Sequence, residues 1–170
     1  TIVDDNSSDT GGLSGSVMEI DGNGTSGEWV FSQYAIPIEN LNHVYEMEYK
    51  VRSKVLDGDG KNQVYAGFAC LDEDFNQTNG SLGGEGAGSG THRYFCANGT
   101  TLTDTDWHTF TGQITGVGTG RTNFRSDTKY VRPMFIVNYN GGTGTAQVAH
   151  VKLKNLTTGE TSEQNSVTDD

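Results

Sequence analysis

The pattern of the whole chain is organised around one apolar-rich stretch, from Thr128 to Leu156. Two apolar-rich segments, Tyr130 to Tyr139 and Gln147 to Leu153, flank a glycine-rich stretch at 140–144. This arrangement predicts two long antiparallel strands joined by a turn. Large side chains occupy both faces of the first strand, which is typical of a central strand in a β-sandwich. Pro133, however, cannot donate a ladder hydrogen bond and predicts a bulge or an edge at that point.

Shorter segments with the same character precede this pair. The most regular of them is HVYEMEYKVRSKV at 43–55, where Tyr45, Met47, Tyr49 and Val51 alternate with charged residues. This alternation indicates a strand with one solvent-exposed face. Helical signal is confined to a single turn at 38–42. The eight predicted strands are Ser16 to Ile20, Glu28 to Ala35, Val44 to Val55, Gln63 to Leu71, Thr91 to Ala97, Trp107 to Ile114, Tyr130 to Tyr139 and Gln147 to Leu153.

Eight such strands with glycine-rich turns predict an all-β fold, an antiparallel β-sandwich of the jelly-roll type. An immunoglobulin-like Greek key is the alternative, but the chain lacks the tryptophan that such domains place in the core between their two cysteines. A chain of 170 residues with 24 glycines and two prolines is long enough for one domain. We expect the sandwich to occupy residues 17–156.

Both ends of the chain are polar and without periodicity. We therefore interpret residues 1–16 as an N-terminal arm and residues 157–170 as a C-terminal tail. Segments of this composition become ordered where something holds them, and we expect a neighbouring subunit of a homo-oligomer to do so.

The charge balance excludes several kinds of partner. The 22 acidic and 11 basic residues give a formal net charge of -11, and no basic stretch offsets it. We therefore expect neither nucleic acid nor an anionic membrane surface as a partner. No apolar run reaches the ~20 residues that span a bilayer, and the first residues lack the pattern of a signal peptide, so we expect a soluble mature chain or fragment.

The two cysteines, Cys70 and Cys96, both fall in predicted strands. If they face the same way, one disulfide could close the loop between them and stabilise the fold by roughly 3 kcal/mol. Two buried free thiols are the alternative. Zinc is not expected, because no CxxC spacing occurs and the histidines are scattered.

A short stretch beginning at Asp57 presents oxygen ligands around glycines. Asp57, Asp59 and Asn62 alternate with other residues in the manner of a calcium loop, and they are the candidate metal ligands. The twelfth position of an EF-hand would require a glutamate, where this chain has Phe68. An ordinary turn between two strands is therefore the alternative interpretation.

Catalytic signatures are weak. Glu19 and Asp21 resemble the opening of a laminarinase-type motif, but the second carboxylate that retaining hydrolysis requires is missing two residues further on. No GxSxG elbow lies between a strand and a helix. We expect the four histidines to be structural residues of strands, and we expect no enzymatic activity.

Aromatic residues and arginine at strand faces give a stronger indication. Sugars stack their apolar faces on aromatic rings and exchange hydrogen bonds with polar groups at the rim. Some aromatic residues will instead belong to the core, since aromatics dominate sandwich interiors. The candidate ligand-binding residues are His92, Tyr94, Tyr130, Arg132 and Tyr139.

Four stretches carry a resemblance to a known family. They are YEMEYKVRS, VYAGFACLDED, DTDWHTFTGQITG and FRSDTKYVRPMFIVNYNGGTGTAQVAHVKLKNL. Together they resemble the jelly-roll modules of phage tail fibres, tailspikes and other virion proteins, which are similar to galactose-binding-like carbohydrate-binding modules. The resemblance implies an appendage module that recognises surface polysaccharide, often with a structural calcium. The chain has Ala149 where family members commonly place an aspartate, a difference that affects the usual calcium ligands.

Two functions of different class follow. The first is a glycan-binding or adhesion module of a virion or an extracellular appendage, with surface polysaccharide as its partner. The second is a purely structural subunit, such as a capsid-decoration or filament protein, whose terminal arms lock into neighbouring subunits.

Overall fold

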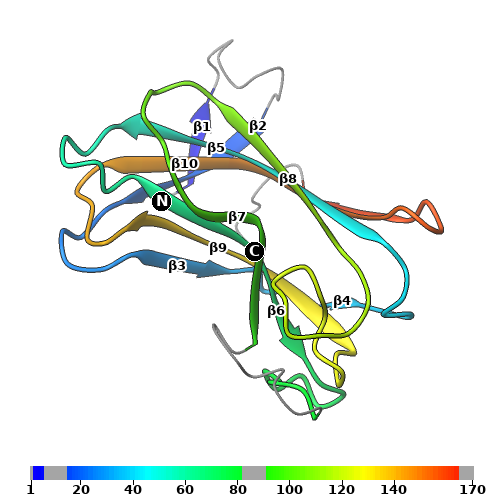
Figure 1. Cartoon of the computed structure of the whole chain (residues 1–170). Helices are drawn as coiled ribbons and strands as arrows, with labels where there is room; N and C mark the ends of the chain where they lie inside the picture. The colour runs from blue at the N-terminus through cyan, green and yellow to red at the C-terminus, as the bar shows by residue number, and fades with distance from the viewer. Residues whose placement is uncertain (1, 6–14, 82–90, 165–170) are drawn as a thin grey trace.

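The computed structural model describes the backbone of residues 2–5, 15–81 and 91–164 and the side chains of residues 17–81 and 91–162. Two antiparallel β-sheets pack face to face, with one layer above the other in Figure 1. Within the described ranges there is no helix, and so none that could span a membrane.

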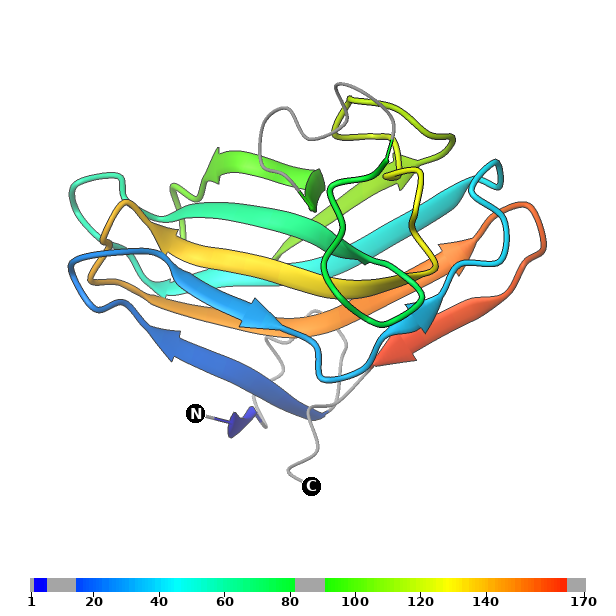
Figure 2. The same ribbon diagram turned by 90° about the horizontal axis from the view of Figure 1, so that it is seen from below.

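The six-stranded sheet has the strand order β1-β2-β10-β5-β8, and β11 also pairs with β10. Figure 2 shows β10 and β5 running alongside each other through the middle of this layer. The strands of this sheet are β1 (Ile2–Asp5), β2 (Gly15–Asp21), β5 (Tyr45–Val55), β8 (His108–Ile114), β10 (Thr145–Asn155) and β11 (Thr161–Gln164).

The five-stranded sheet has the strand order β3-β9-β6-β7, and the short β4 also pairs with β9. Its strands are β3 (Glu28–Phe31), β4 (Ile36–Pro37), β6 (Gln63–Leu71), β7 (His92–Thr101) and β9 (Tyr130–Tyr139). The structure therefore confirms the predicted antiparallel β-sandwich, and each of the eight predicted strands corresponds to an observed one.

The sequence pattern missed β1, β4 and β11. The first and last of these lie within the segments interpreted as arms, and their backbones pair with β2 and β10 of the same chain. Backbone hydrogen bonds alone can hold a short edge strand, so its sequence need not alternate between apolar and polar residues.

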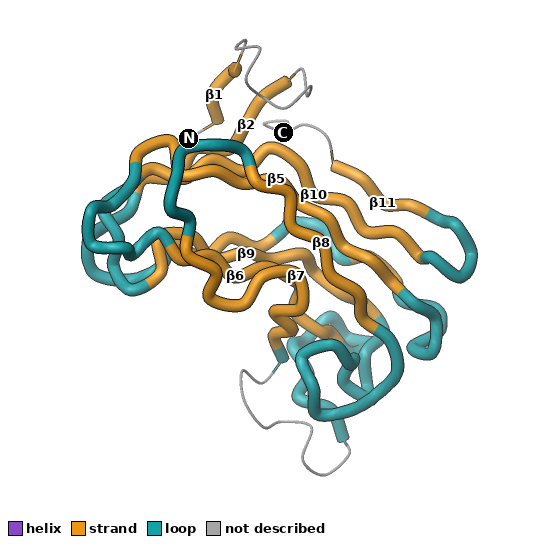
Figure 3. The backbone as a smooth tube through the Cα atoms, turned by 45° about the horizontal axis from the view of Figure 1, so that its top comes forward, coloured by secondary structure: helices purple, strands orange, loops and turns teal. Residues whose placement is uncertain are grey.

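Counted over the described strands, the chain crosses from one sheet to the other at six of ten connections. The connections β1–β2, β3–β4, β6–β7 and β10–β11 join strands of the same sheet. Such crossing between two four-stranded layers, with the extra strands added at their margins, differs from a simple meander. The jelly-roll topology itself stays a prediction. Residues 72–81, which follow β6, and residues 115–129, which follow β8, lie side by side at one end of the sandwich (Figure 3). There the Ser81 hydroxyl donates a hydrogen bond to Asp127 at 2.8 Å.

Pro133 lies in a central strand, not at a true edge, and the pairing of β9 explains why it is tolerated. On one side it lies opposite Phe68 of β6. On the other side, β3 pairs only with Met134 and the residues after it, whereas β4 pairs only with Val131 and Tyr130. The missing N–H therefore falls in the gap between β3 and β4, where the Pro133 carbonyl still accepts a hydrogen bond from the Ser32 N–H at 2.8 Å.

The inner faces of the two sheets form two adjoining apolar clusters. One is centred on Tyr49, Val51 and Phe135, and the other on Phe68, Phe124 and Met47. The fully buried ring of Phe68 contacts Phe95 and Phe124, at centroid distances of 4.8 Å and 5.6 Å.

Two glycines permit close backbone contact around β7. A Cβ atom on Gly67 of β6 would collide with the carbonyl group of Arg93. A Cβ atom on Gly112 of β8 would collide with the carbonyl group of Phe95. Through the second contact, β7 of one sheet closes against β8 of the other, and the Cys96 thiol donates to the Phe110 carbonyl at 3.2 Å.

The predicted disulfide is wrong, because Cys70 and Cys96 are both buried free thiols. The register of β6 and β7 gives the reason. The Cys70 N–H donates to the carbonyl of Thr91, so Cys96 lies five residues further along β7. At about 3.3 Å per residue the two cysteines are too far apart to be bridged.

We expect both thiols to be inert to a thiol reagent such as DTNB in the native protein. Burial raises the pKa of both cysteines, that of Cys96 to about 12, so little reactive thiolate forms at neutral pH. Two thiols per chain should titrate when the protein is unfolded without reductant. If no thiol reacts in the unfolded, unreduced protein, Cys70 and Cys96 are joined by a disulfide and the free-thiol assignment is wrong.

Candidate functional site

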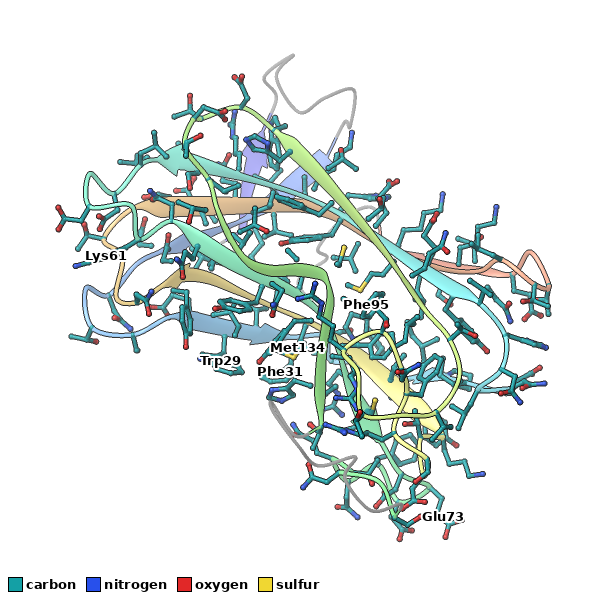
Figure 4. The ribbon with its side chains drawn as sticks, in the orientation of Figure 1. Trp29, Phe31, Lys61, Glu73, Phe95 and Met134 are labelled. Carbon is teal, nitrogen blue, oxygen red and sulfur yellow. The ribbon has the colours of Figure 1, made fainter. Side chains whose placement is uncertain are left out.

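The outer face of the five-stranded sheet, which points away from the six-stranded sheet, carries a continuous group of aromatic side chains. Strand alternation places Arg132, Met134 and Ile136 of β9 on this side, with Phe31 and Trp29 of β3 opposite the last two. Figure 4 shows Trp29 and Phe31 below the sheets. We define the aromatic face by Trp29, Phe31, Tyr65, His92, Tyr94, Tyr130, Arg132 and Tyr139.

A small apolar base lies under these rings. Met134 and Ile136 are 1% and 2% exposed, and Tyr94 packs with them. The neighbouring positions of β6 are Gly67, opposite Met134, and Ala69, opposite Arg132. The face is therefore a third, smaller hydrophobic cluster whose outer layer is only partly covered.

The rings contact one another in a row across the strands. The side chain of His92, the first residue of β7, reaches the rings of β3. Its ring centroid lies 5.5 Å from that of Trp29 and 5.7 Å from that of Phe31. Its Nδ1 atom is 3.1 Å from the Tyr94 hydroxyl. Tyr65 then contacts Tyr94 at 5.2 Å, edge to face.

Tyr139 joins this row through a local irregularity at the end of β9. Its ring centroid lies 4.8 Å from that of Tyr65. Asn138 has a positive φ of 50° and a buried side chain that donates to the Ile20 carbonyl of the other sheet at 3.3 Å. The alternation of inward and outward side chains in β9 therefore shifts by one residue after Val137. Asn138 points toward the other sheet, and Tyr139 lies on the outer face.

Exposure is concentrated at the rim of the face. Trp29 is 48% exposed, an unusual fraction for a tryptophan in a strand. Arg132 is partly exposed, and its buried Nε atom has no hydrogen-bond partner among the described residues. A partly buried guanidinium N–H without an acceptor carries a desolvation cost that a bound oxygen atom would relieve.

Burial shifts the pKa values of two groups of the face, His92 and Tyr94, toward their neutral forms. Burial lowers the pKa of His92 below its ordinary value. Burial, together with neighbouring Tyr139 and Tyr65, raises the pKa of Tyr94 to about 12. The face thus offers a neutral imidazole and a neutral phenol, groups suited to exchanging hydrogen bonds with uncharged hydroxyls.

All five predicted ligand-binding residues lie on this one face. Four further rings lie around them and are not among the predicted ligand-binding residues, those of Trp29, Phe31, Tyr65 and Phe75. For two of these a signal existed, because Trp29 and Phe31 are two residues apart in one strand and so share a side. Phe75 stacks on Tyr130 from a loop, with ring centroids 4.3 Å apart, and no sequence period indicates such a contact.

The predicted calcium ligands lie together in the turn between β5 and β6. One carboxylate oxygen of Asp57 accepts hydrogen bonds from the Thr143 N–H at 2.7 Å and from its hydroxyl at 3.0 Å, and the other accepts the Asp59 N–H at 2.8 Å. Asn62 exchanges hydrogen bonds with the Asp57 backbone. In the described parts of the chain no three His, Cys, Asp or Glu side chains form a metal-binding group, and calcium here stays a prediction.

We expect Asp57→Asn to lower the melting temperature. Both carboxylate oxygens of Asp57 accept hydrogen bonds, and an asparagine side chain can offer only one acceptor oxygen. Its NH2 group would face an N–H donor, which would weaken the contacts of the β5–β6 turn. Backbone hydrogen bonds from Thr143 and Asp59 lower the pKa of Asp57, so its stabilising contribution is complete above the unfolded value of about 3.9 and is lost as the pH falls through the folded pKa. The deficit of the variant should therefore shrink at the most acidic pH in a thermal-melt series.

Asp59→Asn is the matched control, since the Asp59 side chain is 79% exposed. Repeating the melts with added calcium separates the two interpretations of the loop. A calcium-dependent rise that disappears in Asp57→Asn would establish a metal site, whereas a deficit that persists unchanged to the most acidic pH would contradict the carboxylate's role.

The outer face of the six-stranded sheet is polar by contrast. Glu19 is held by Lys54 at 2.7 Å and by Gln147 at 2.8 Å, and the hydrogen bond from Lys54 lowers its pKa. Arg52 stacks over the ring of Trp107 at 4.8 Å. These contacts account for Glu19 as a member of a surface ion pair.

Comparison with protein-family models and with curated proteins found no match to this sequence. The resemblance to jelly-roll modules of virion proteins therefore stays a prediction. The function has to be inferred from the geometry of the chain itself.

Proposed function

We propose that the protein is a non-enzymatic glycan-binding module and that the aromatic face binds the sugar. The observation that carries this proposal is the half-exposed Trp29 ring beside Phe31 and His92 on a rigid strand. A flat indole at the surface suits the apolar C–H face of a pyranose ring, and stacking of this kind recurs where proteins bind sugars.

Hydrogen-bonding groups surround the stacking surface. The imidazole of His92 and the guanidinium of Arg132 flank the small Ala69 side chain, because both residues lie opposite Ala69 in the sheet. A sugar seated on the rings could therefore place its hydroxyls against both groups. Rigid strands beneath the site would keep the entropic cost of binding low.

The proposal extends to the setting of the protein. We infer a jelly-roll module of a virion or an extracellular appendage that binds surface polysaccharide beside neighbouring subunits of a homo-oligomer, with calcium as a possible structural ion. The strand order and the resemblance in sequence support this setting.

A glycan array probed with the protein and calcium tests the function. We expect Trp29→Ala to weaken binding to the saccharides retained by the wild-type protein by about tenfold, which corresponds to ~1.4 kcal/mol. Trp107→Ala on the opposite sheet is the matched control, and it should bind normally. No saccharide binding by the wild-type protein, or equal losses in the two variants, would contradict the proposal.

A structural subunit remains the second candidate because of the chain ends. β1 and β11 add to the six-stranded sheet by backbone pairing, and a neighbouring copy could accept the same strands. Removing residues 1–16 should then abolish assembly in light scattering while circular dichroism still shows a β-sandwich. Unchanged assembly would remove this candidate.

A further inference from the structure

We propose that the aromatic face accommodates an extended, carboxylate-bearing oligosaccharide, with one sugar stacked on Trp29, another on the Phe75–Tyr130 pair and a carboxylate held by Arg132 between them. This inference rests on the glycan-binding function proposed above. It adds the length and the charge of the ligand.

Two exposed stacking surfaces lie at opposite ends of the face. Trp29 is opposite Ile136, and Tyr130 is six residues before Ile136 on the same strand and on the same side. At about 3.3 Å per residue the two surfaces are separated by about 20 Å, a span longer than one sugar ring. A single sugar could use only one of them.

The second surface is formed by a loop that is tied down. Phe75 is 52% exposed and stacks on Tyr130 at an interplanar angle of 26°. It adopts a φ of 63°, a region that bulky residues rarely occupy. Asp72 holds this conformation, because its carboxylate accepts the N–H groups of Asp74 and Asn76 at 3.0 Å and 2.9 Å. The ring is therefore presented to solvent by a fixed backbone.

Arg132 supplies the charge between the two surfaces. It lies two residues from Tyr130 and, through Ala69, opposite His92. In the described part of the chain it forms no ion pair, and its buried Nε has no acceptor. The rest of the face contributes no carboxylate, so a partly buried cation faces neutral rings. A ligand carboxylate would supply both the missing charge and a bidentate acceptor.

The net charge of -11 opposes an anionic ligand only at long range. At physiological ionic strength, screening acts over about 8 Å, so a direct guanidinium–carboxylate contact outweighs distant acidic groups.

Isothermal titration with oligosaccharide ladders tests the inference. The probes are oligogalacturonates, hyaluronan oligomers and alginate oligomers, each from the monosaccharide to the hexasaccharide, and the carboxyl-reduced form of each ladder. We expect affinity to rise with length until both surfaces are spanned and to fall at least tenfold on carboxyl reduction. Phe75→Ala should remove the gain from length without affecting short oligomers. Arg132→Gln should weaken binding to the acidic ladder at least tenfold more than binding to the reduced one, so that the preference for the acidic ladder disappears.

Three results would overturn the inference. If the reduced ladders bind as tightly as the acidic ones, the charge assignment fails while the glycan-binding function stands. If short and long oligomers bind equally and Phe75→Ala has no effect, the second stacking surface fails, again without loss of the function. If no acidic or reduced ladder binds, the inference fails, and the glycan array then decides whether the function fails as well. Melting temperatures of the variants within a few degrees of the wild type would show that each remains folded.

Discussion

Gly67→Val should leave the protein largely unfolded. A Cβ atom at position 67 would collide with the Arg93 carbonyl oxygen and approach its carbon to 2.8 Å, and both are backbone atoms of the adjacent strand that cannot rotate away. Separating β6 from β7 would break their ladder and displace Phe95 of the core. We expect the free energy of unfolding to fall by more than about 4 kcal/mol. Losses of this size occur when a substitution causes a severe steric clash or disrupts the core.

Urea denaturation followed by circular dichroism measures this loss. Gly58→Ala is the matched control, because a Cβ atom at position 58 would meet nothing within 4 Å. The control should unfold within about 0.5 kcal/mol of the wild type. A Gly67→Val protein with an unchanged midpoint would show that the two strands do not approach as closely as described.

Phe68→Ala should cost about 3–5 kcal/mol, the usual range for removing a fully buried phenylalanine ring. Phe68 is 0% exposed, and its ring stacks on Phe124 and meets Phe95 edge to face. Its removal would open a cavity where the loop 115–129 packs on the sandwich, so the loop should loosen together with the core.

Differential scanning calorimetry and hydrogen exchange at residues 115–129 test both parts of this expectation. Phe75→Ala is the control of the same residue type, and because that ring is 52% exposed its effect on stability should be small. A loss at Phe68 no larger than that at Phe75 would contradict the packing described for the core.

The strands that bury one face were predictable because burial imposes a period of two residues on the sequence. In β5 the alternation of Tyr45, Met47 and Tyr49 with charged residues identified the strand and its inner side. The short β1, β4 and β11 have no such period, and the backbone of each pairs with a neighbouring strand. The position of Pro133 could not be understood from the sequence either, because it depends on a gap between two neighbouring strands.

The candidate site was predictable to the extent that it lies on strands. Alternation places Tyr130 and Arg132 on one side of β9, and His92 and Tyr94 share one side of β7. The contact of Phe75 with Tyr130 and the register that separates Cys70 from Cys96 depend on how distant segments align. A single sequence does not encode such alignment in any local pattern.

The closure of β7 against β8 at Gly112 has a consequence for self-association. These two strands are the outermost members of their sheets on one side of the molecule, and their contact leaves little free edge there for a strand from another chain to join. Amyloid-like stacking or filament growth by edge addition would have to begin on the opposite side, where β1 and β3 end the two sheets.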